Sequence, residues 1–299
     1  MYNLNMSDAR QIEIGNTSGL EDEWLEWYRL TPRERWRESE KLWDFFLQMG
    51  GLLDPEPDSQ SPLELNQSDV LYLLMGGQAC VLYGAAEFSR DTDIAVLSEA
   101  DNLRQLTVAL DRLQAEPIAV PPFEAKYLLR GHAVHFRCRH PDAAGERVDV
   151  MSVMRGVAPF SELWQRRTTL DYDAGMRIEL FSLPDLVCAK KTQRDKDWPM
   201  LRRLVESHFF RNRENPQPAQ IAFWLRESRT VSMLLDLARQ DRPTVTALLK
   251  ERPLLSFALQ GNDAELATAL MEEEKAIREV DRVYWLPLKA ELERLRHHP

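Results

Sequence analysis

The chain reads Leu71-Tyr-Leu-Leu-Met-Gly-Gly-Gln-Ala79 and, after a short connection, Ser89-Arg-Asp-Thr-Asp-Ile-Ala-Val-Leu97. The first segment ends in Gly76-Gly77, and such a turn lets the backbone approach a ligand and direct free N–H groups at it. Asp91 and Asp93 stand two residues apart, so on a strand both carboxylates project from one face. Together the segments predict a phosphate-cradling loop beside carboxylates that can hold a metal ion. Each motif alone also fits a plain tight turn or a solvated strand start.

Composition limits the class of protein. The 299 residues suit one large or two ordinary domains, and the 44% hydrophobic content supports a core. The formal net charge of -10 disfavours binding of nucleic acid by bulk attraction, although a local basic patch could still bind it. No apolar run reaches the length of a membrane span, and the start has no signal-peptide pattern. Three scattered cysteines argue against a disulfide framework, so we expect a cytoplasmic protein with no membrane partner.

Three regions follow from the apolar periodicity and the turn residues. We expect an N-terminal helical extension and linker at 1–62 and a core of alternating strands and helices at 63–213. A C-terminal helical region follows at 214–299. The fold class is therefore α+β, with a mixed β-sheet flanked by helices. In the first region Thr31-Pro32-Arg33-Glu34 has the pattern of a capping box, and a linker rich in Pro and Ser spans 50–62.

Shorter elements can be placed within these regions. We expect a helix over 78–83, opened by the Gly-Gly turn, and a long helix from Leu183 through Lys190. The C-terminal region is helical throughout, with breaks near Pro243, Pro253, Gly261 and Pro287. The other elements are a strand or short helix at 70–75, strands at 93–97, 133–139, 147–153 and 177–182, and an amphipathic helix at 99–113.

A third carboxylate lies on a later strand. In Arg147-Val-Asp149-Val-Met151 the alternation of a strand puts Arg147, Asp149 and Met151 on one face. A carboxylate in the middle of a strand is costly to bury alone, so either an arginine or a metal ion should pair with Asp149. A two-metal phosphoryl-transfer site requires such a carboxylate near Asp91 and Asp93. The sequence does not prove that the two strands are adjacent.

A basic segment follows, with two interpretations. Lys190-Lys-Thr-Gln-Arg-Asp-Lys-Asp197 continues to Arg202, Arg203, Arg211 and Arg213. Such a run is usually a solvated helix face, but its lysines could instead reach triphosphate oxygens. A separate cluster of His132, His135, Cys138 and His140 could suggest zinc, yet strand alternation sets the first two on opposite sides.

In their order, these motifs resemble those of the DNA polymerase β-type nucleotidyltransferase superfamily. The minimal and abortive-infection toxin-like nucleotidyltransferases of prokaryotes are the most similar branch. The shared motifs are Gly-Gly-x-Ala, Ser-x-Asp-x-Asp before an apolar strand, a lone Asp on a later strand, and a lysine-bearing segment with Lys-Asp. They cover roughly 70–210, under half of the chain. The resemblance implies the nucleotidyltransferase fold and a Mg²⁺-dependent transfer of NMP from an NTP to a hydroxyl group, with release of pyrophosphate.

The resemblance also implies roles for single residues. Asp91 and Asp93 match the pair that binds two Mg²⁺ ions, and Asp149 matches the third carboxylate, which helps to hold the catalytic metal and favours deprotonation of the attacking hydroxyl. Gly77 stands where many relatives carry a serine, and Glu87 where they often carry an arginine. The nucleotide-binding positions are Gly76, Gly77, Ser89, Lys190 and Lys196, and Asp197 completes the Lys-Asp motif.

Several functional alternatives stay open. The acceptor could be RNA such as tRNA, a protein or a small molecule, and the basic run slightly favours RNA. The enzyme could be the toxin of a toxin–antitoxin or phage-defence system, with a cognate antitoxin as partner. The alternative class is a non-catalytic binding or regulatory protein that keeps the fold. The C-terminal helices, with Tyr284 and Trp285, are expected to buttress or cover the active site.

Overall fold

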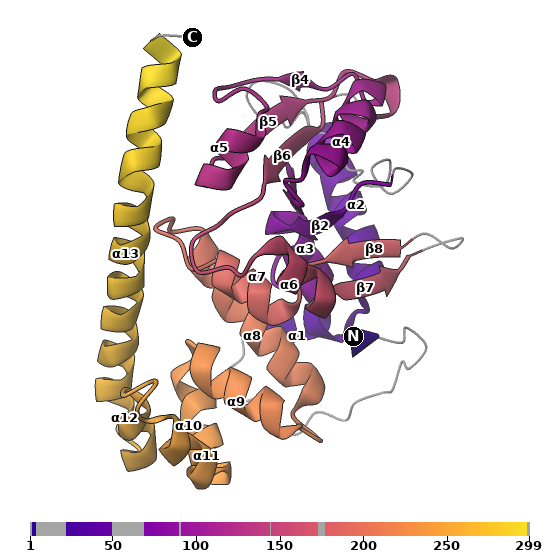
Figure 1. The fold of residues 1–299 in the computed structure, drawn as a ribbon. Coiled ribbons are helices and arrows are strands. Elements are labelled where there is room, and N and C mark those ends of the chain that lie inside the picture. The colour runs from indigo at the N-terminus through magenta and orange to yellow at the C-terminus, as the bar shows by residue number, and fades with distance from the viewer. Residues whose placement is uncertain are drawn as a thin grey trace.

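The computed structural model describes residues 2–3, 22–49, 69–89, 91–143, 145–172 and 177–297. Over these residues the chain is a mixed α/β protein, compatible with the predicted α+β class (Figure 1). Its sheet has eight strands in the order β1-β7-β8-β2-β3-β6-β5-β4. In chain order the strands are β1 Tyr2–Asn3, β2 Tyr72–Met75, β3 Asp91–Val96, β4 Glu116–Pro117, β5 Val134–Arg137, β6 Arg147–Met151, β7 Thr168–Asp171 and β8 Arg177–Leu180.

The centre of the sheet is formed by β2, β3 and β6. Strand β3 pairs antiparallel with β2 and parallel with β6, so Asp93 lies opposite Met75 on one side and Asp149 on the other. Strand β5 continues the sheet antiparallel to β6 and places His135 opposite Asp149. The buried apolar side chains of these strands include Leu73, Leu74, Ile94, Val96, Val134, Val148 and Val150. The adjacency of the two carboxylate-bearing strands, which the sequence left open, is thereby established.

Helices flank this sheet. The capping box at Thr31 is confirmed, because the Glu34 N–H donates to the Thr31 hydroxyl at 3.2 Å and the Thr31 N–H donates to the Glu34 carboxylate at 2.7 Å. The helix after the Gly-Gly turn is confirmed as α3. Up to Asn212 the helices are α1 Asp22–Arg29, α2 Pro32–Gln48, α3 Gly76–Tyr83, α4 Ala100–Arg112, α5 Ala125–Arg130, α6 Phe160–Arg166, α7 Leu183–Ala189 and α8 Asp197–Asn212, with a 3₁₀ turn at Pro141–Ala143.

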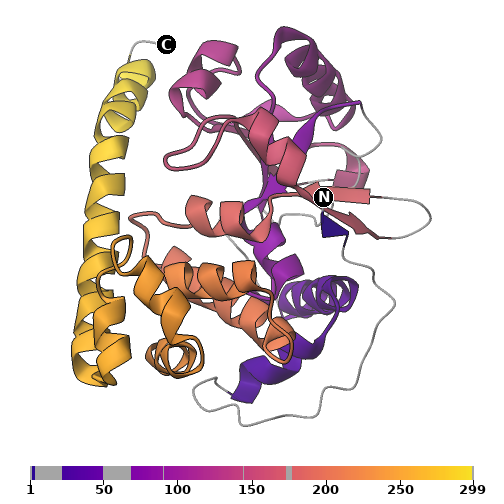
Figure 2. The ribbon, with the colours of Figure 1, turned by 60° about the horizontal axis from the view of Figure 1, so that its bottom comes forward.

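The C-terminal region consists of four short helices and one long one. They are α9 Pro218–Glu227, α10 Val231–Gln240, α11 Arg242–Leu248, α12 Leu255–Gln260 and α13 Asp263–His297. Buried side chains of this region, such as Trp224 and Leu255, belong to the same hydrophobic cluster as the central strands. Figures 1 and 2 show α13 running along one whole side of the molecule. None of the helices in the described ranges is long and apolar enough to span a membrane.

The long helix expected from Leu183 is shorter than predicted. Helix α7 ends at Ala189, and a turn over 190–196 separates it from α8. Two contacts hold the turn against the start of α8. Lys190 Nζ lies 3.2 Å from Asp197 Oδ1, and the Trp198 indole N–H donates to the Thr192 carbonyl at 2.9 Å. Lys190 and Lys196 therefore flank a turn rather than sit on one helix.

The predicted break at Pro287 is also wrong, because Pro287 lies inside α13. Contacts on both sides of the proline, at Asp281 and Glu291, hold the helix against the rest of the chain. The breaks expected near Pro243, Pro253 and Gly261 do coincide with helix boundaries. The linker predicted at 50–62 lies outside the described residues. Of the first twenty residues only Tyr2–Asn3 is described, and it pairs parallel with β7, a strand that the sequence pattern did not indicate.

Candidate active site

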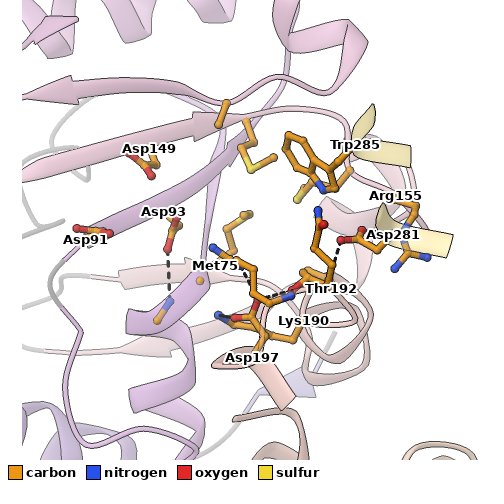
Figure 3. Close-up of a pocket in the computed structure, with 18 of the residues that line it drawn as sticks. Met75, Asp91, Asp93, Asp149, Arg155, Lys190, Thr192, Asp197, Asp281 and Trp285 are labelled. Atoms are coloured by element: carbon orange, nitrogen blue, oxygen red, sulfur yellow. Dashed lines mark hydrogen bonds and ion pairs between the residues drawn. The ribbon is translucent and has the colours of Figure 1, made fainter. Parts of the chain in front are cut away.

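One cavity of about 790 Å³ collects the predicted site residues. Its walls come from the ends of β3 and β6, the start of α3, the turn between α7 and α8, and one face of α13. Figure 3 shows the three aspartates on one side of this cavity and Trp285 on the other, with Lys190 below them. All eight residues that the sequence proposed line it: Gly76, Gly77, Ser89, Asp91, Asp93, Asp149, Lys190 and Lys196.

Asp93 is the most perturbed of the three carboxylates. It lies beside Asp149 in the parallel register of β3 and β6, and Asp91 projects from the same face of its own strand. Burial, and then the negative charge of Asp149, raise the pKa of Asp93 to about 6, although Lys190 opposes this shift. Adjacent carboxylates in a partly buried cavity repel each other unless a proton or a cation lies between them.

Asp149 is hydrogen-bonded to two side chains of the protein, Arg147 and His135. The guanidinium of Arg147 donates from Nε to Oδ1 at 2.8 Å and from Nη2 to Oδ2 at 3.0 Å. His135 Nδ1 lies 2.8 Å from the same Oδ1. Burial alone would raise the pKa of Asp149, but these two partners outweigh it and hold the pKa below its ordinary value. Of the alternatives that the sequence left open, pairing with Arg147 is the one present here.

His135 is a site residue that sequence reasoning missed. The sequence indicates it only as part of a possible zinc cluster with His132, yet the two histidines have different partners. His132 Nε2 lies 2.9 Å from Glu291 Oε2 on α13, whereas His135 contacts Asp149 and lies 3.1 Å from Arg147 Nη2. His135 could have been predicted only from the pairing of β5 with β6, which sets it opposite Asp149. The residue pattern of one strand does not reveal that pairing.

The two glycines of the turn are required by their neighbours. Gly76 has a positive φ of 67°, and a Cβ there would lie 1.8 Å from Asp93 Oδ2. A Cβ on Gly77 would lie 2.1 Å from the Ser89 hydroxyl oxygen. The Gly77 N–H points toward Asp93 Oδ2 at 3.4 Å. The turn therefore brings bare backbone against Asp93 and Ser89, closer than a side chain at either position would allow.

Lys190 is a buried cation that faces the carboxylates. Burial lowers its pKa, but the negative groups around it, which include Asp197 and Asp93, outweigh burial and hold the pKa above its ordinary value. Asp197 is fully buried and also accepts hydrogen bonds from Thr192 and Arg194. Lys190 is thus a fixed positive charge, whereas Lys196 is exposed at the cavity.

The rest of the basic run does not form one patch. Lys191 pairs with Glu227 on α9 at 2.7 Å. Arg211 is half-buried and donates to the carbonyl oxygens of Tyr28 and Leu30, and the guanidinium of Arg203 stacks on the Trp24 ring at 3.8 Å. Most of these cations are therefore structural ties between elements.

Helix α13 supplies the wall opposite the carboxylates. Asp281 is buried and accepts from Arg155 Nε and from the Gln193 backbone N–H, each at 2.8 Å. Tyr284 packs its hydroxyl against Gly131, where a Cβ would lie 2.3 Å away. Trp285 and Lys289 line the cavity from the same helix. The sequence predicted that these helices buttress or cover the site, but it did not indicate which face does so.

The oxygen-rich donor set can be tested against magnesium. Over the described ranges no three His, Cys, Asp or Glu side chains are gathered around a common metal position. Mg²⁺ normally takes one or two protein carboxylates, and the phosphates of a substrate complete its coordination. Asp91 and Asp93 project from one strand face into the cavity and supply two such carboxylates.

Comparison with known proteins gives this chain no family. A scan against protein-family models finds no match, and a search of curated proteins finds none either.

Proposed function

We propose that this protein is a Mg²⁺-dependent nucleotidyltransferase with the fold of the DNA polymerase β-type superfamily. The observation that carries the proposal is the parallel pairing of β3 and β6, which sets Asp93 beside Asp149 at a cavity bordered by the Gly76-Gly77 turn. The reaction would transfer NMP from an NTP to an acceptor hydroxyl. A bond forms between the acceptor oxygen and the α-phosphorus, the α–β phosphoanhydride bond breaks, and pyrophosphate leaves with the proton passing to a base.

Asp91 and Asp93 would hold magnesium together with the nucleotide phosphates, and Asp149 would complete the donor set. When bound, the metal ions would neutralise charge on the attacking and leaving oxygens. Cation binding would also relieve the repulsion that raises the pKa of Asp93. Arg147 would then share or release Asp149, because the same carboxylate oxygens serve both.

Other residues of the chain have separate tasks in this proposal. The backbone of Gly76-Gly77 lies where triphosphate oxygens can approach, and Lys190 adds a fixed positive charge on that side. Asp149 would accept the proton of the attacking hydroxyl. His135 is hydrogen-bonded to Asp149 and would position that carboxylate. The acceptor is proposed only as a hydroxyl of RNA such as tRNA, of a protein or of a small molecule, and a toxin role with a cognate antitoxin is a further proposal.

Thermal unfolding with magnesium and each NTP tests the binding half of this proposal. A ligand that binds only the native state raises the midpoint, and we expect a rise when Mg²⁺ and NTP are added together. The matched variant Asp91→Asn/Asp93→Asn should lose that rise. If no NTP raises the midpoint of the native protein in the presence of Mg²⁺, the proposal is wrong.

A non-catalytic binding protein is the second candidate. The observation that favours it is the engagement of both Asp149 oxygens by Arg147, which keeps the third carboxylate from a ligand. Such a protein would gain stability from a nucleotide but would transfer nothing. Arg147→Gln distinguishes the two, because freeing Asp149 should change the metal dependence of an enzyme and leave a simple binding site with the same nucleotide affinity.

A further inference from the structure

We infer that the cavity-lining face of α13 is the site of the nucleobase, with Trp285 as the surface on which the base stacks. This inference rests on the proposed function and adds to it the place where the nucleoside end of the substrate binds. It assigns to the C-terminal helix a direct part in ligand binding.

The spacing along α13 defines the face. Asp281, Trp285, Lys289 and Leu292 line the cavity, and steps of three or four residues put them in one row along a helix. Leu286, the residue after Trp285, is 51% exposed and is not part of the cavity wall. The row therefore presents the Trp285 ring between a buried acid and an exposed lysine, and Tyr284 lines the cavity beside it.

The two ends of the cavity differ in chemistry. One end holds three carboxylates, a buried lysine and bare glycine backbone, which suit a metal-bound polyphosphate. Trp285 lies on the opposite side (Figure 3), and apolar side chains such as Met154 and Leu292 also line the cavity. A ligand that is highly charged at one end and flat and aromatic at the other satisfies both, and a nucleotide has that form. A volume of about 790 Å³ lies within the range of pockets for such ligands.

The aromatic wall is held in place before any ligand arrives. Asp281 joins α13 to Arg155 and to the Gln193 backbone, and Glu291 joins it to His132. The Tyr284 ring stands perpendicular to the Trp285 ring, with their centroids 5.9 Å apart. A ring fixed in this way loses little conformational freedom when a base stacks on it, so the contact contributes to affinity.

Calorimetric titration can separate the base from the phosphates. The ligands are the four NTPs and inorganic triphosphate, each with Mg²⁺, and the proteins are the native chain, Trp285→Ala, Trp285→Phe and the neighbouring control Leu286→Ala. We expect Trp285→Ala to weaken binding of at least one NTP about tenfold, since stacking on an aromatic side chain is worth about one such factor or more per base. Trp285→Phe should recover most of that loss. All four proteins should bind triphosphate equally.

Three results would overturn the inference. Equal NTP affinity in Trp285→Ala and the native chain would remove the base from α13. An equal loss of NTP and triphosphate affinity in Trp285→Ala would make Trp285 a support of the cavity instead. If the native chain binds neither ligand, the proposed function fails as well. After either of the first two results the proposed function still stands, provided that the native chain binds NTP and the Asp93→Asn variant does not.

Discussion

Asp93 is the site carboxylate whose ionisation the fold opposes. Its pKa rises from 3.8 to about 6 because it is partly removed from solvent and because the charges of Asp149 and Asp91 are close. Between pH values of about 4 and 6 the Asp93 carboxyl is therefore more protonated in the folded chain than in the unfolded chain. The contribution of Asp93 to the free energy of unfolding consequently falls as the pH rises through this range.

Replacing this charge should stabilise the protein without metal. At pH 7.5 in a chelating buffer, we expect Asp93→Asn to raise the free energy of unfolding by about 1–3 kcal/mol. The gain should vanish near pH 4, where the native carboxyl is already protonated. Urea unfolding at the two pH values measures this, with Asp111→Asn, an exposed acid on α4, as the control. A destabilised Asp93→Asn at pH 7.5 would contradict the account of the site.

A second substitution at Ser89 should rescue the stability of a Gly77 variant but not that of a Gly76 variant. We expect Gly76→Ala and Gly77→Ala each to lower the free energy of unfolding by about 1–3 kcal/mol, since each new Cβ would overlap a neighbour. Ser89→Gly removes the neighbour of Gly77 and should recover part of that loss. It should not help Gly76→Ala, which also suffers from its positive φ. Equal recovery of both variants in urea unfolding would show that the overlaps are not the cause.

At the scale of elements, α13 depends on a few polar ties. Asp281 has only 4% of its side chain exposed, and both of its oxygens are engaged. Asp281→Asn breaks a buried ion pair and should lower the free energy of unfolding by about 2–4 kcal/mol. Amide hydrogen exchange should also accelerate along α13 and in the turn near Gln193, ahead of the central strands.

A surface pair on the same helix provides the control for this prediction. Glu279 pairs with Arg282 in full contact with solvent, so Glu279→Gln should change neither stability nor exchange. If Asp281→Asn leaves exchange along α13 at the native rate, the helix is held by its apolar contacts and the tie at Asp281 is incidental.

Local patterns predicted the elements better than their junctions. The capping box, α3 and β3 follow from short-range residue patterns, and the structure has them. The end of α7 could not be predicted, because it depends on the ion pair of Lys190 with a residue seven positions later. The continuity of α13 past Pro287 depends on partners distant in the sequence.

The candidate site shows the same division between local and long-range information. Strand alternation was enough to put Asp91 and Asp93 on one face. Arg147 lies two residues from Asp149 on the same strand, so the sequence could indicate it as a partner. His135 could not be found in this way, because its contact with Asp149 depends on the pairing of β5 with β6. The sequence could not predict that Trp285 lines the cavity, because this depends on where α13 lies relative to the sheet. The periodicity of apolar residues within the helix does not contain that information.

At the scale of the whole molecule, the cavity is assembled from segments spread over most of the chain. Strand β3, strand β6, the turn before α8 and the last helix each contribute one wall. One hydrophobic cluster joins the C-terminal helices to the sheet, so we expect the segments that form the cavity to fold and unfold as one unit. We therefore expect magnesium and nucleotide to stabilise the entire chain in one cooperative transition.

Transfer of label from α-³²P NTP is the measurement that tests nucleotidyl transfer most directly. Each NTP would be incubated with Mg²⁺, the protein, and separate pools of tRNA and cell protein, beside Asp91→Ala/Asp93→Ala. The account predicts that label enters one pool with one or more NTPs, that pyrophosphate is released in equal amount, and that the double variant transfers none. Label transferred equally by the double variant, or no label in either pool and no release of pyrophosphate, would contradict it.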